Sequence, residues 1–316
     1  MATSINLGIS SCLLGQKFRY DGEHKLDPFL TYTVGQHVKY VPVCPEVECG
    51  FGIPREALRL TGDPESPRLI TKITHKDFTE RMVRWAKKRI IELEKADLWG
   101  FIFKSKSPNC GMEKVTVYNE RGMPVKKGSG IFARIFMEHF PLIPVEDEGH
   151  LYDPKLRENF IERIFIQKRW SEVLAKKWRI ENIMGFHTEH ELLILSHSEK
   201  HFRSMGKIVV IGNELPIKEL YGKYEAQLME ALKLKTTMRK NTHVLQHLMG
   251  DFKSQLSADE RQALVEVIHQ YREGYVPLIV PITLINHYAG EYKTPYLSKQ
   301  AYLQPHPIAL QLRNHV

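Results

Sequence analysis

Short apolar runs alternate with longer amphipathic stretches through the first half of the chain. The runs at residues 5–10, 41–43, 69–73, 101–103 and 142–145 are bounded by Gly, Pro or charged residues, a pattern that predicts buried strands. Between them, apolar residues recur at helical spacing, and we expect helices over residues 27–39, 75–96 and 131–139. Alternation of this kind predicts an α/β domain with a mostly parallel, doubly wound sheet.

The pattern changes after the acidic segment 146–149. From there the apolar spacing is helical almost throughout, and it predicts helices over residues 154–177, 189–198, 216–248 and 261–273. Ser257-Ala258-Asp259-Glu260 has the form of a capping box ahead of the last of these helices. We therefore expect an α/β domain over residues 1–148 and an all-α domain over residues 149–316.

Composition places the chain among ordinary globular proteins, with 42% hydrophobic and 26% charged residues. The most apolar stretch, residues 276–285, is too short to cross a membrane and contains two prolines. The first residues lack the basic and apolar regions of a signal peptide. With only four cysteines in 316 residues, we expect a reducing compartment, the cytoplasm, with no disulfide framework and no membrane partner.

The net charge of +8 is spread over both halves of the chain. Residues 1–150 hold 22 Lys and Arg against 19 Asp and Glu, and residues 151–316 hold 23 against 18. A modest excess of this kind is compatible with RNA as a partner and does not demand one. The basic helical stretches supply the candidates for RNA contact, Arg81, Arg84, Lys87, Lys88, Arg163, Lys168, Arg169, Lys176 and Lys177.

Three of the four cysteines follow a predicted strand directly or within a few residues. Cys12, Cys44 and Cys110 each lie in a segment rich in Gly, Pro, Ser and charge, which is unusual for cysteines of an apolar core. Loops at the carboxyl ends of parallel strands line one crevice of an α/β sheet. Three soft thiolate ligands around such a crevice suit an iron–sulfur cluster or zinc.

These segments resemble the TudS-type thiouracil desulfidases. The resemblance is carried by Cys-Leu-x-Gly and Arg-Tyr-Asp-Gly from Cys12 onward, by Cys-Pro-Glu at Cys44 and by Ser-Pro-x-Cys-Gly around Cys110, and it runs through residues 5–145. The segments 186–198 and 277–281 are similar to the helical domain of the longer RudS-type proteins, which remove sulfur from 4-thiouridine in tRNA.

The resemblance implies a 4Fe-4S cluster held by Cys12, Cys44 and Cys110, and hydrolysis of a thiocarbonyl without net redox change. It also implies Glu46 as the acid/base and Ser107 as a hydroxyl that contacts the substrate. Cys49 departs from the pattern of the single-domain enzymes. Three readings stay open for it: a spare thiol, a replacement for Cys44 as ligand, or a fourth ligand that would close the cluster.

The chemistry requires these residue types. A cluster held by three cysteines leaves one iron open to the soft sulfur of a thiouracil. Acting as a Lewis acid, this iron would withdraw electron density from the adjacent ring carbon, which water could then attack. A nearby carboxylate is needed for proton transfer, and Glu46 lies two residues from Cys44, with Glu48 as its competitor. Ser107 has an alternative role as the turn-forming residue before Pro108.

Three functions follow as expectations. The first is desulfuration of 4-thiouridine in tRNA, with the helical domain holding the RNA. The second is desulfuration of free thiouracil bases, which requires neither a helical domain nor a basic surface. The third is a non-catalytic zinc or iron–sulfur protein that binds RNA or senses redox state.

Overall fold

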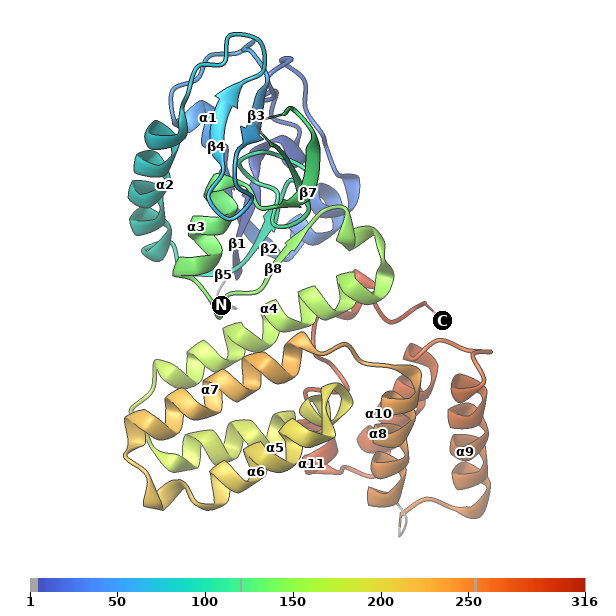
Figure 1. Cartoon of the computed structure of the whole chain (residues 1–316). Helices are drawn as coiled ribbons and strands as arrows, with labels where there is room; N and C mark the ends of the chain where they lie inside the picture. The colour runs from blue at the N-terminus through green and yellow to red at the C-terminus, as the bar shows by residue number, and fades with distance from the viewer. Residues whose placement is uncertain (1–4, 120, 253–254, 316) are drawn as a thin grey trace. The chain divides into compact units, whose positions relative to one another are not determined.

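The computed structural model describes residues 5–119, 121–252 and 255–315. The chain divides into two compact units, Met1–Asp153 and Pro154–Val316, drawn in Figure 1 in blue to green and in green to red. The boundary expected between residues 148 and 149 lies shortly before this division.

The first unit is built on a four-stranded sheet of order β2-β1-β5-β8 in which every neighbouring pair is parallel. Its strands are β1 (Ile5–Ser10), β2 (Val38–Val43), β5 (Leu98–Phe103) and β8 (Val145–Asp147). The chain moves outward from β1 to β2 and then returns past β1 to β5. This reversal makes the β1–β5 pair a switch point, beside which the carboxyl ends of the strands leave a crevice.

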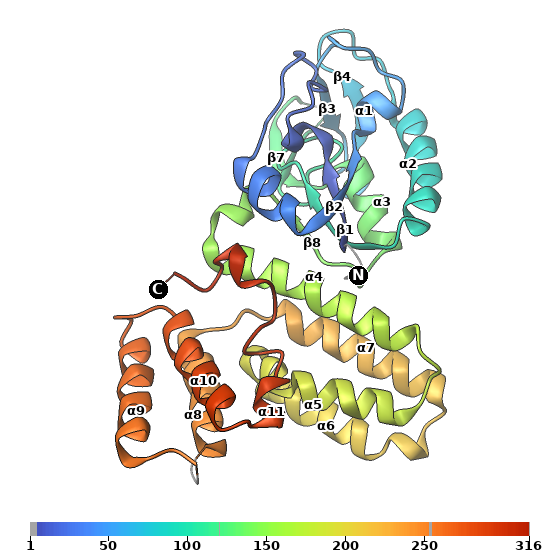
Figure 2. The ribbon, with the colours of Figure 1, turned by 180° about the vertical axis from the view of Figure 1, so that it is seen from behind.

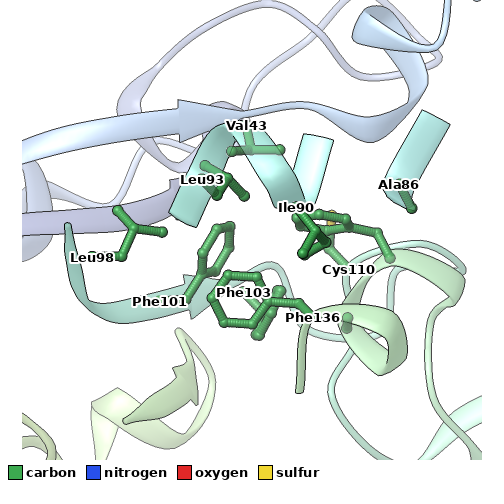
Figure 3. Close-up of a cluster of buried hydrophobic side chains, with 11 residues drawn as sticks. Val43, Ala86, Ile90, Leu93, Leu98, Phe101, Phe103, Cys110 and Phe136 are labelled. Atoms are coloured by element: carbon green, nitrogen blue, oxygen red, sulfur yellow. The ribbon is translucent and has the colours of Figure 1, made fainter. Parts of the chain in front are cut away.

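Two helices cover one face of this sheet, α2 (Thr79–Glu94) and α3 (Ile131–His139). Their apolar sides pack on β2 and β5 around Phe101, Phe103 and Phe136, and Cys110 lies at the edge of the same core (Figure 3). The connection from β1 to β2 runs on the opposite side of the unit, as the two views in Figures 1 and 2 agree. The predicted doubly wound arrangement is therefore confirmed.

A second sheet, of order β4-β3-β6-β7, was not expected as a separate sheet, although the strand predicted over residues 69–73 belongs to it. It contains β3 (Leu58–Thr61), β4 (Arg68–Thr71), β6 (Val115–Tyr118) and β7 (Pro124–Gly128). Two of its pairs are antiparallel and the central β3–β6 pair is parallel. Its apolar side packs on α2 and α3 through Leu60, Leu69 and Val117.

Two predicted helices of this unit differ from the structure. Residues 27–39 form only a π-helical turn, Phe29–Thr33, and a 3₁₀ turn, Val34–Gln36, before β2 begins. The helix expected from residue 75 starts at Thr79, because His75 has a φ of 54° and Thr74 bonds to Glu56 and not to a helix end.

The second unit is helical. Its helices are α4 (Pro154–Leu174), α5 (Ile180–His197), α6 (Glu199–Val210), α7 (Ile217–Lys233), α8 (Met238–Asp251), α9 (Ala258–Arg272), α10 (Ile279–Glu291) and α11 (Pro295–Ser298). The capping box at Ser257 and Glu260 forms as predicted. The single helix expected over residues 216–248 is two helices, α7 and α8, and Thr237 caps the second through the Lys240 N–H.

A cluster of aromatic side chains lies in the core of this unit. Trp170 of α4 is buried against the rings of Phe186, Tyr221 and Tyr224. The prediction of an α/β domain followed by an all-α domain is confirmed. None of the helices in the described ranges is both long and apolar enough to cross a membrane.

Candidate active site

A pocket of about 380 Å³ opens at the carboxyl ends of β1, β2 and β5. This volume lies in the range of small-molecule sites. The thiols of Cys12, Cys44 and Cys110 all line it, together with Glu46 and Ser107. The structure therefore brings all five site residues expected from the sequence to one cavity.

The local backbone explains how two of the thiols reach the pocket. Cys12 lies in the 3₁₀ turn Ser11–Leu14, which ends at Gly15 with a φ of 84°. Cys44 is the residue before the short helix α1 (Pro45–Glu48), whose first position is proline. Because each turn begins where its strand ends, the side chains leave the sheet at the same edge.

The Cys110 loop is anchored to the start of α3. Carbonyl oxygens of Pro108 and Asn109 accept from the N–H groups of Ile131 and Ala133 at 3.1 and 3.0 Å. Such groups at a helix start otherwise lack partners. Within the loop, Ser107 Oγ accepts from the N–H groups of Asn109 and Cys110 at 3.2 and 3.0 Å. The expected turn-forming role of Ser107 is therefore present, and its hydroxyl hydrogen remains available to the pocket.

Burial dominates the electrostatics of the three thiols. It raises the pKa of Cys12 to about 11, with the nearby Lys104 acting in the opposite direction. Burial and the charge of Glu46 raise the pKa of Cys44 to about 12 and that of Cys110 well above its usual value. All four cysteines of the chain are free. Thiolates in this pocket therefore need a positive charge beside them, which bound metal supplies.

Glu46 is held on both carboxylate oxygens. Its Oε1 accepts from Asn109 Nδ2 at 2.7 Å, and its Oε2 pairs with Arg55 Nη2 at 3.2 Å. The Cys44 thiol lies 3.8 Å from the same Oε2. Glu46 is therefore fixed at the pocket wall, within reach of a group bound near Cys44. Neither Arg55 nor Asn109 was expected from the sequence as a partner of Glu46.

The two alternative residues of the Cys44 loop lie outside the pocket. Glu48 accepts from the Cys44 N–H at 2.8 Å and pairs with Arg89 at 3.0 Å. The Cys49 thiol donates to the carbonyl of Arg81 at 3.7 Å and packs in the apolar core between α2 and the second sheet. Of the two carboxylates only Glu46 lines the pocket, and the Cys49 thiol lies apart from the other three.

Polar and aromatic side chains form the rest of the wall. Arg19 and Tyr20 line the pocket, and Arg19 pairs with Asp21 at 3.1 Å. Lys104 also lines it and forms a short ion pair with Glu148, whose other oxygen accepts from the Ser105 N–H at 2.7 Å. Lys104 is therefore part of the loop's internal support.

The donor set fits an iron–sulfur cluster. Three soft thiols share the pocket and the fourth cysteine of the chain does not. Across the described ranges, no three His, Cys, Asp or Glu side chains are placed to hold a single metal ion. A zinc ion draws its ligands to within about 2.3 Å of one point, whereas each cysteine of a cluster binds a different iron, so cluster cysteines lie further apart.

Two family models match the chain, one in each unit. Residues 7–148 match the family described as 2-thiouracil desulfurase. Residues 191–307 match a family described as a protein of unknown function, DUF1722. The resemblance expected from the three cysteine segments is thereby confirmed.

Two relatives and one solved structure each match part of the chain. Residues of this chain are 31% identical to the uncharacterized protein YbgA of Escherichia coli over 133 residues, 42% of this chain and 79% of that protein. They are 29% identical to the uncharacterized protein YbbK of Bacillus subtilis over 135 residues, 41% of this chain and 88% of that protein. A solved structure titled as a 4Fe-4S-dependent thiouracil desulfidase, TudS, is 27% identical, with a TM-score of 0.39 over 48% of this chain and 95% of that one. The chain is thus a relative of YbgA whose first unit matches the 2-thiouracil desulfurase family and whose second unit matches the DUF1722 family.

Proposed function

We propose that this protein is an iron–sulfur desulfidase that removes sulfur from 4-thiouridine in tRNA and releases hydrogen sulfide. Cys12, Cys44 and Cys110 would hold a 4Fe-4S cluster, with Glu46 and Ser107 beside it. The observation that carries the proposal is the shared pocket, which gathers three thiols, a fixed carboxylate and a hydroxyl.

The cofactor has one task in this scheme. When bound, a 4Fe-4S cluster with an open iron supplies a soft Lewis acid for the thiocarbonyl sulfur. The chain supplies the rest of the chemistry. Glu46 takes a proton from water at Oε1 or Oε2 and returns it to the ring nitrogen or the leaving sulfur, because its carboxylate lines the pocket beside the Cys44 thiol. Ser107 donates its free hydroxyl hydrogen to the base edge.

The wall of the pocket favours a planar base. Phe18 and Tyr20 line it alongside Pro45 and Leu58, and aromatic and apolar surfaces of this kind stack against nucleobases.

Support for an RNA substrate comes from a basic surface on the helical unit, made by α6, α8 and α9. A hollow of about 1110 Å³ is lined by Arg239, Lys240, His243 and Arg272, among other residues. It meets a second hollow at Glu199, which is lined by Lys200, Arg203 and Lys207. We call these seven cationic side chains the α6–α8 basic surface.

Charge on this surface is only partly balanced by the protein itself. Arg272 lies 3.9 Å from Glu273, and Lys240 donates to the carbonyls of His197 and Lys235. The first turn of α8 holds Arg239 and Lys240 and no acidic residue, although the start of a helix favours negative charge. Glu199, the carboxylate shared by the two hollows, pairs with Arg203. Phosphate groups of a bound polyanion would supply the missing charge.

Three of the nine RNA candidates chosen from the sequence are engaged in contacts within the protein. Arg81 donates to the carbonyls of Cys49 and Gly50, and Arg169 donates to the carbonyl of Gln304. Lys168 pairs with Glu172 at 3.3 Å. The other six candidates stay predictions, and we add the α6–α8 basic surface to them as a proposed RNA contact. The cytoplasmic location stays a prediction.

Sulfide release separates the candidate substrates. We expect the protein with its cluster to desulfurate tRNA that carries 4-thiouridine with a lower KM than free 4-thiouracil. Equal kcat/KM for the two substrates would favour the free base as the true substrate. Colourless protein with stoichiometric zinc and no sulfide release would instead support the non-catalytic reading.

A further inference from the structure

We propose that Asn109 is a positioning residue for Glu46, holding its carboxylate toward the pocket without touching the substrate. The inference rests on the proposed acid/base role of Glu46. Position 109 is the open position in the Ser-Pro-x-Cys-Gly segment, so the segment itself assigns it no task. Asn109 does not line the pocket, whereas its neighbours Pro108 and Cys110 do.

The contact between the two side chains is direct and buried. Asn109 Nδ2 donates to Glu46 Oε1 at 2.7 Å, and Asn109 is 0% exposed. The second oxygen of Glu46 pairs with Arg55, which also donates to the carbonyl of Phe18 at 2.9 Å. With each oxygen bound by a different fixed donor, the carboxylate has one orientation.

The backbone of Asn109 is held as firmly as its side chain. Its N–H donates to Ser107 Oγ at 3.2 Å, and its carbonyl accepts from the Ala133 N–H at 3.0 Å. A Cβ at Gly130 would lie 2.4 Å from the carbonyl carbon of Asn109, so the start of α3 presses directly on this residue. Contacts with α3 therefore fix the backbone of Asn109. The Asn109 amide in turn fixes the Glu46 carboxylate through its hydrogen bond.

The amide of Asn109 also has an energetically unfavourable feature, a buried oxygen, that indicates its role. Its Oδ1 is buried and has no hydrogen-bond partner among the described residues. Turning the amide over would bring Oδ1 against the carboxylate of Glu46, so the observed orientation is the one that Glu46 requires. An apolar residue of similar size would avoid the unpaired acceptor. Such a residue could not donate a hydrogen bond to Glu46.

The test uses Asn109→Leu, which has the same number and branching of side-chain heavy atoms, although its methyl groups are bulkier, and which lacks the donor. We expect its cluster content, read as iron, sulfide and visible absorbance, to match the unmodified protein. We expect kcat on free 4-thiouracil to fall about 10- to 100-fold with KM within about twofold, because a small misplacement of a catalytic group costs up to about 10² in rate. The matched control is Asn6→Leu, since Asn6 Nδ2 makes a similar 2.7 Å bond to the Ala96 carbonyl near the amino end of β1.

A double-mutant cycle separates positioning from general support of the loop. In a Glu46→Gln background, Asn109→Leu should lower kcat by less than about threefold further, because the group it positions is already gone. Full additivity, or a kcat within about threefold of the unmodified value for Asn109→Leu alone, would overturn the proposal.

A crystal structure of Asn109→Leu tests the same claim without activity. The proposal expects the Glu46 carboxylate to leave its present position while Cys110 stays in place. An unchanged Glu46 would overturn it. If the unmodified protein binds a cluster yet releases no sulfide, the proposed function fails, and the crystal structure still decides the role of Asn109.

Discussion

The Arg55 guanidinium lies 3.2 Å from the Glu46 carboxylate, and both side chains are largely buried, at 10% and 16% exposed. Both residues line the pocket, and the ion pair joins the helix that follows Cys44 to the segment that leads to β3. A carboxylate held this way keeps its position before the substrate arrives. Arg55 and Asn109 thus give Glu46 the fixed geometry that proton transfer needs.

Replacing Glu46 by Gln tests its role in catalysis. Gln keeps the size of the side chain and removes its ability to take up a proton, so we expect the cluster to be retained. Sulfide release should fall about 10²- to 10⁴-fold, the usual loss when acid/base help is removed. Glu48→Gln is the matched control, because Glu48 lies in the same turn and outside the pocket. If Glu46→Gln stays within about threefold of full activity, Glu46 is not the acid/base.

Cysteine replacements test the ligand set. Cys12→Ser, Cys44→Ser and Cys110→Ser should each lose most of the iron, because each removes one of the three thiols of the pocket. Cys49→Ala should keep the iron, since the Cys49 thiol packs in a separate apolar core. Iron and acid-labile sulfide per chain, after anaerobic purification, are the readouts. Loss of iron from Cys49→Ala with retention in Cys44→Ser would reverse the assignment.

Neutralising the α6–α8 basic surface should weaken binding of tRNA. We expect Arg203→Gln, Arg239→Gln and Arg272→Gln, combined, to reduce the slope of log K against log salt by up to about three, one for each lost phosphate contact. The control is Lys126→Gln with Lys127→Gln, which removes exposed charge from β7. Desulfuration of free 4-thiouracil should not change. An unaltered salt slope would show that RNA binds elsewhere.

Acid should destabilise the helical unit through Glu162. Burial alone would raise the pKa of Glu162, but the charge of His197, its hydrogen bond and the charge of Arg313 together lower this pKa to about 2. The unfolded chain binds this proton near the ordinary value of 4.5. The contribution of Glu162 is therefore complete above pH 4.5 and is lost as the pH falls toward 2.

Unfolding by urea at a series of pH values, followed by circular dichroism, measures this loss. Glu162→Gln should flatten the acid limb of the stability curve and lower stability at neutral pH by about 3–5 kcal/mol, because it leaves His197 without its buried carboxylate and Arg313 with Glu158 alone. An acid limb as steep in the variant as in the unmodified protein would assign the acid sensitivity to other groups.

Gly130→Ala, at the start of α3, should displace the Cys110 loop and so impair cluster binding. A Cβ there would come within 2.5 Å of the carbonyl oxygen of Asn109 and 2.8 Å of the Cys110 nitrogen. The Cys110 loop must then shift, and we expect reduced iron content together with lower thermal stability. Gly222→Ala in α7 is the control, because nothing lies within 4 Å of its Cβ position, and helix propensity favours Ala by up to about 1 kcal/mol. Normal iron content in Gly130→Ala would contradict the proposed coupling of α3 to the loop.

The strand-end cysteines could be predicted because the signal is local. An apolar run followed by Gly, Pro and Ser marks the end of a strand, and parallel strands end at one edge. Cys12, Cys44 and Cys110 needed no further information. The link from Asn109 to Glu46 spans 63 residues of sequence, and only the folded loops bring the two together.

The missed elements have physical reasons of their own. The second sheet escaped prediction because β7 is short and largely exposed, with Lys126 and Lys127 outside any apolar pattern. The break between α7 and α8 falls where apolar spacing continues through Leu234, while Thr237 supplies the cap of a new helix. Caps of this kind decide helix ends more strongly than the spacing of apolar residues.

The central claim is that three thiols and a carboxylate in one pocket make a desulfidase. The most direct test is anaerobic purification of the full chain, followed by iron and sulfide content and a sulfide-release assay on tRNA that carries 4-thiouridine. The account predicts a brown protein with about four iron atoms and four sulfides per chain, and hydrogen sulfide released as 4-thiouridine becomes uridine. A protein fully loaded with its cluster that leaves both thiolated tRNA and free 4-thiouracil unchanged would contradict it.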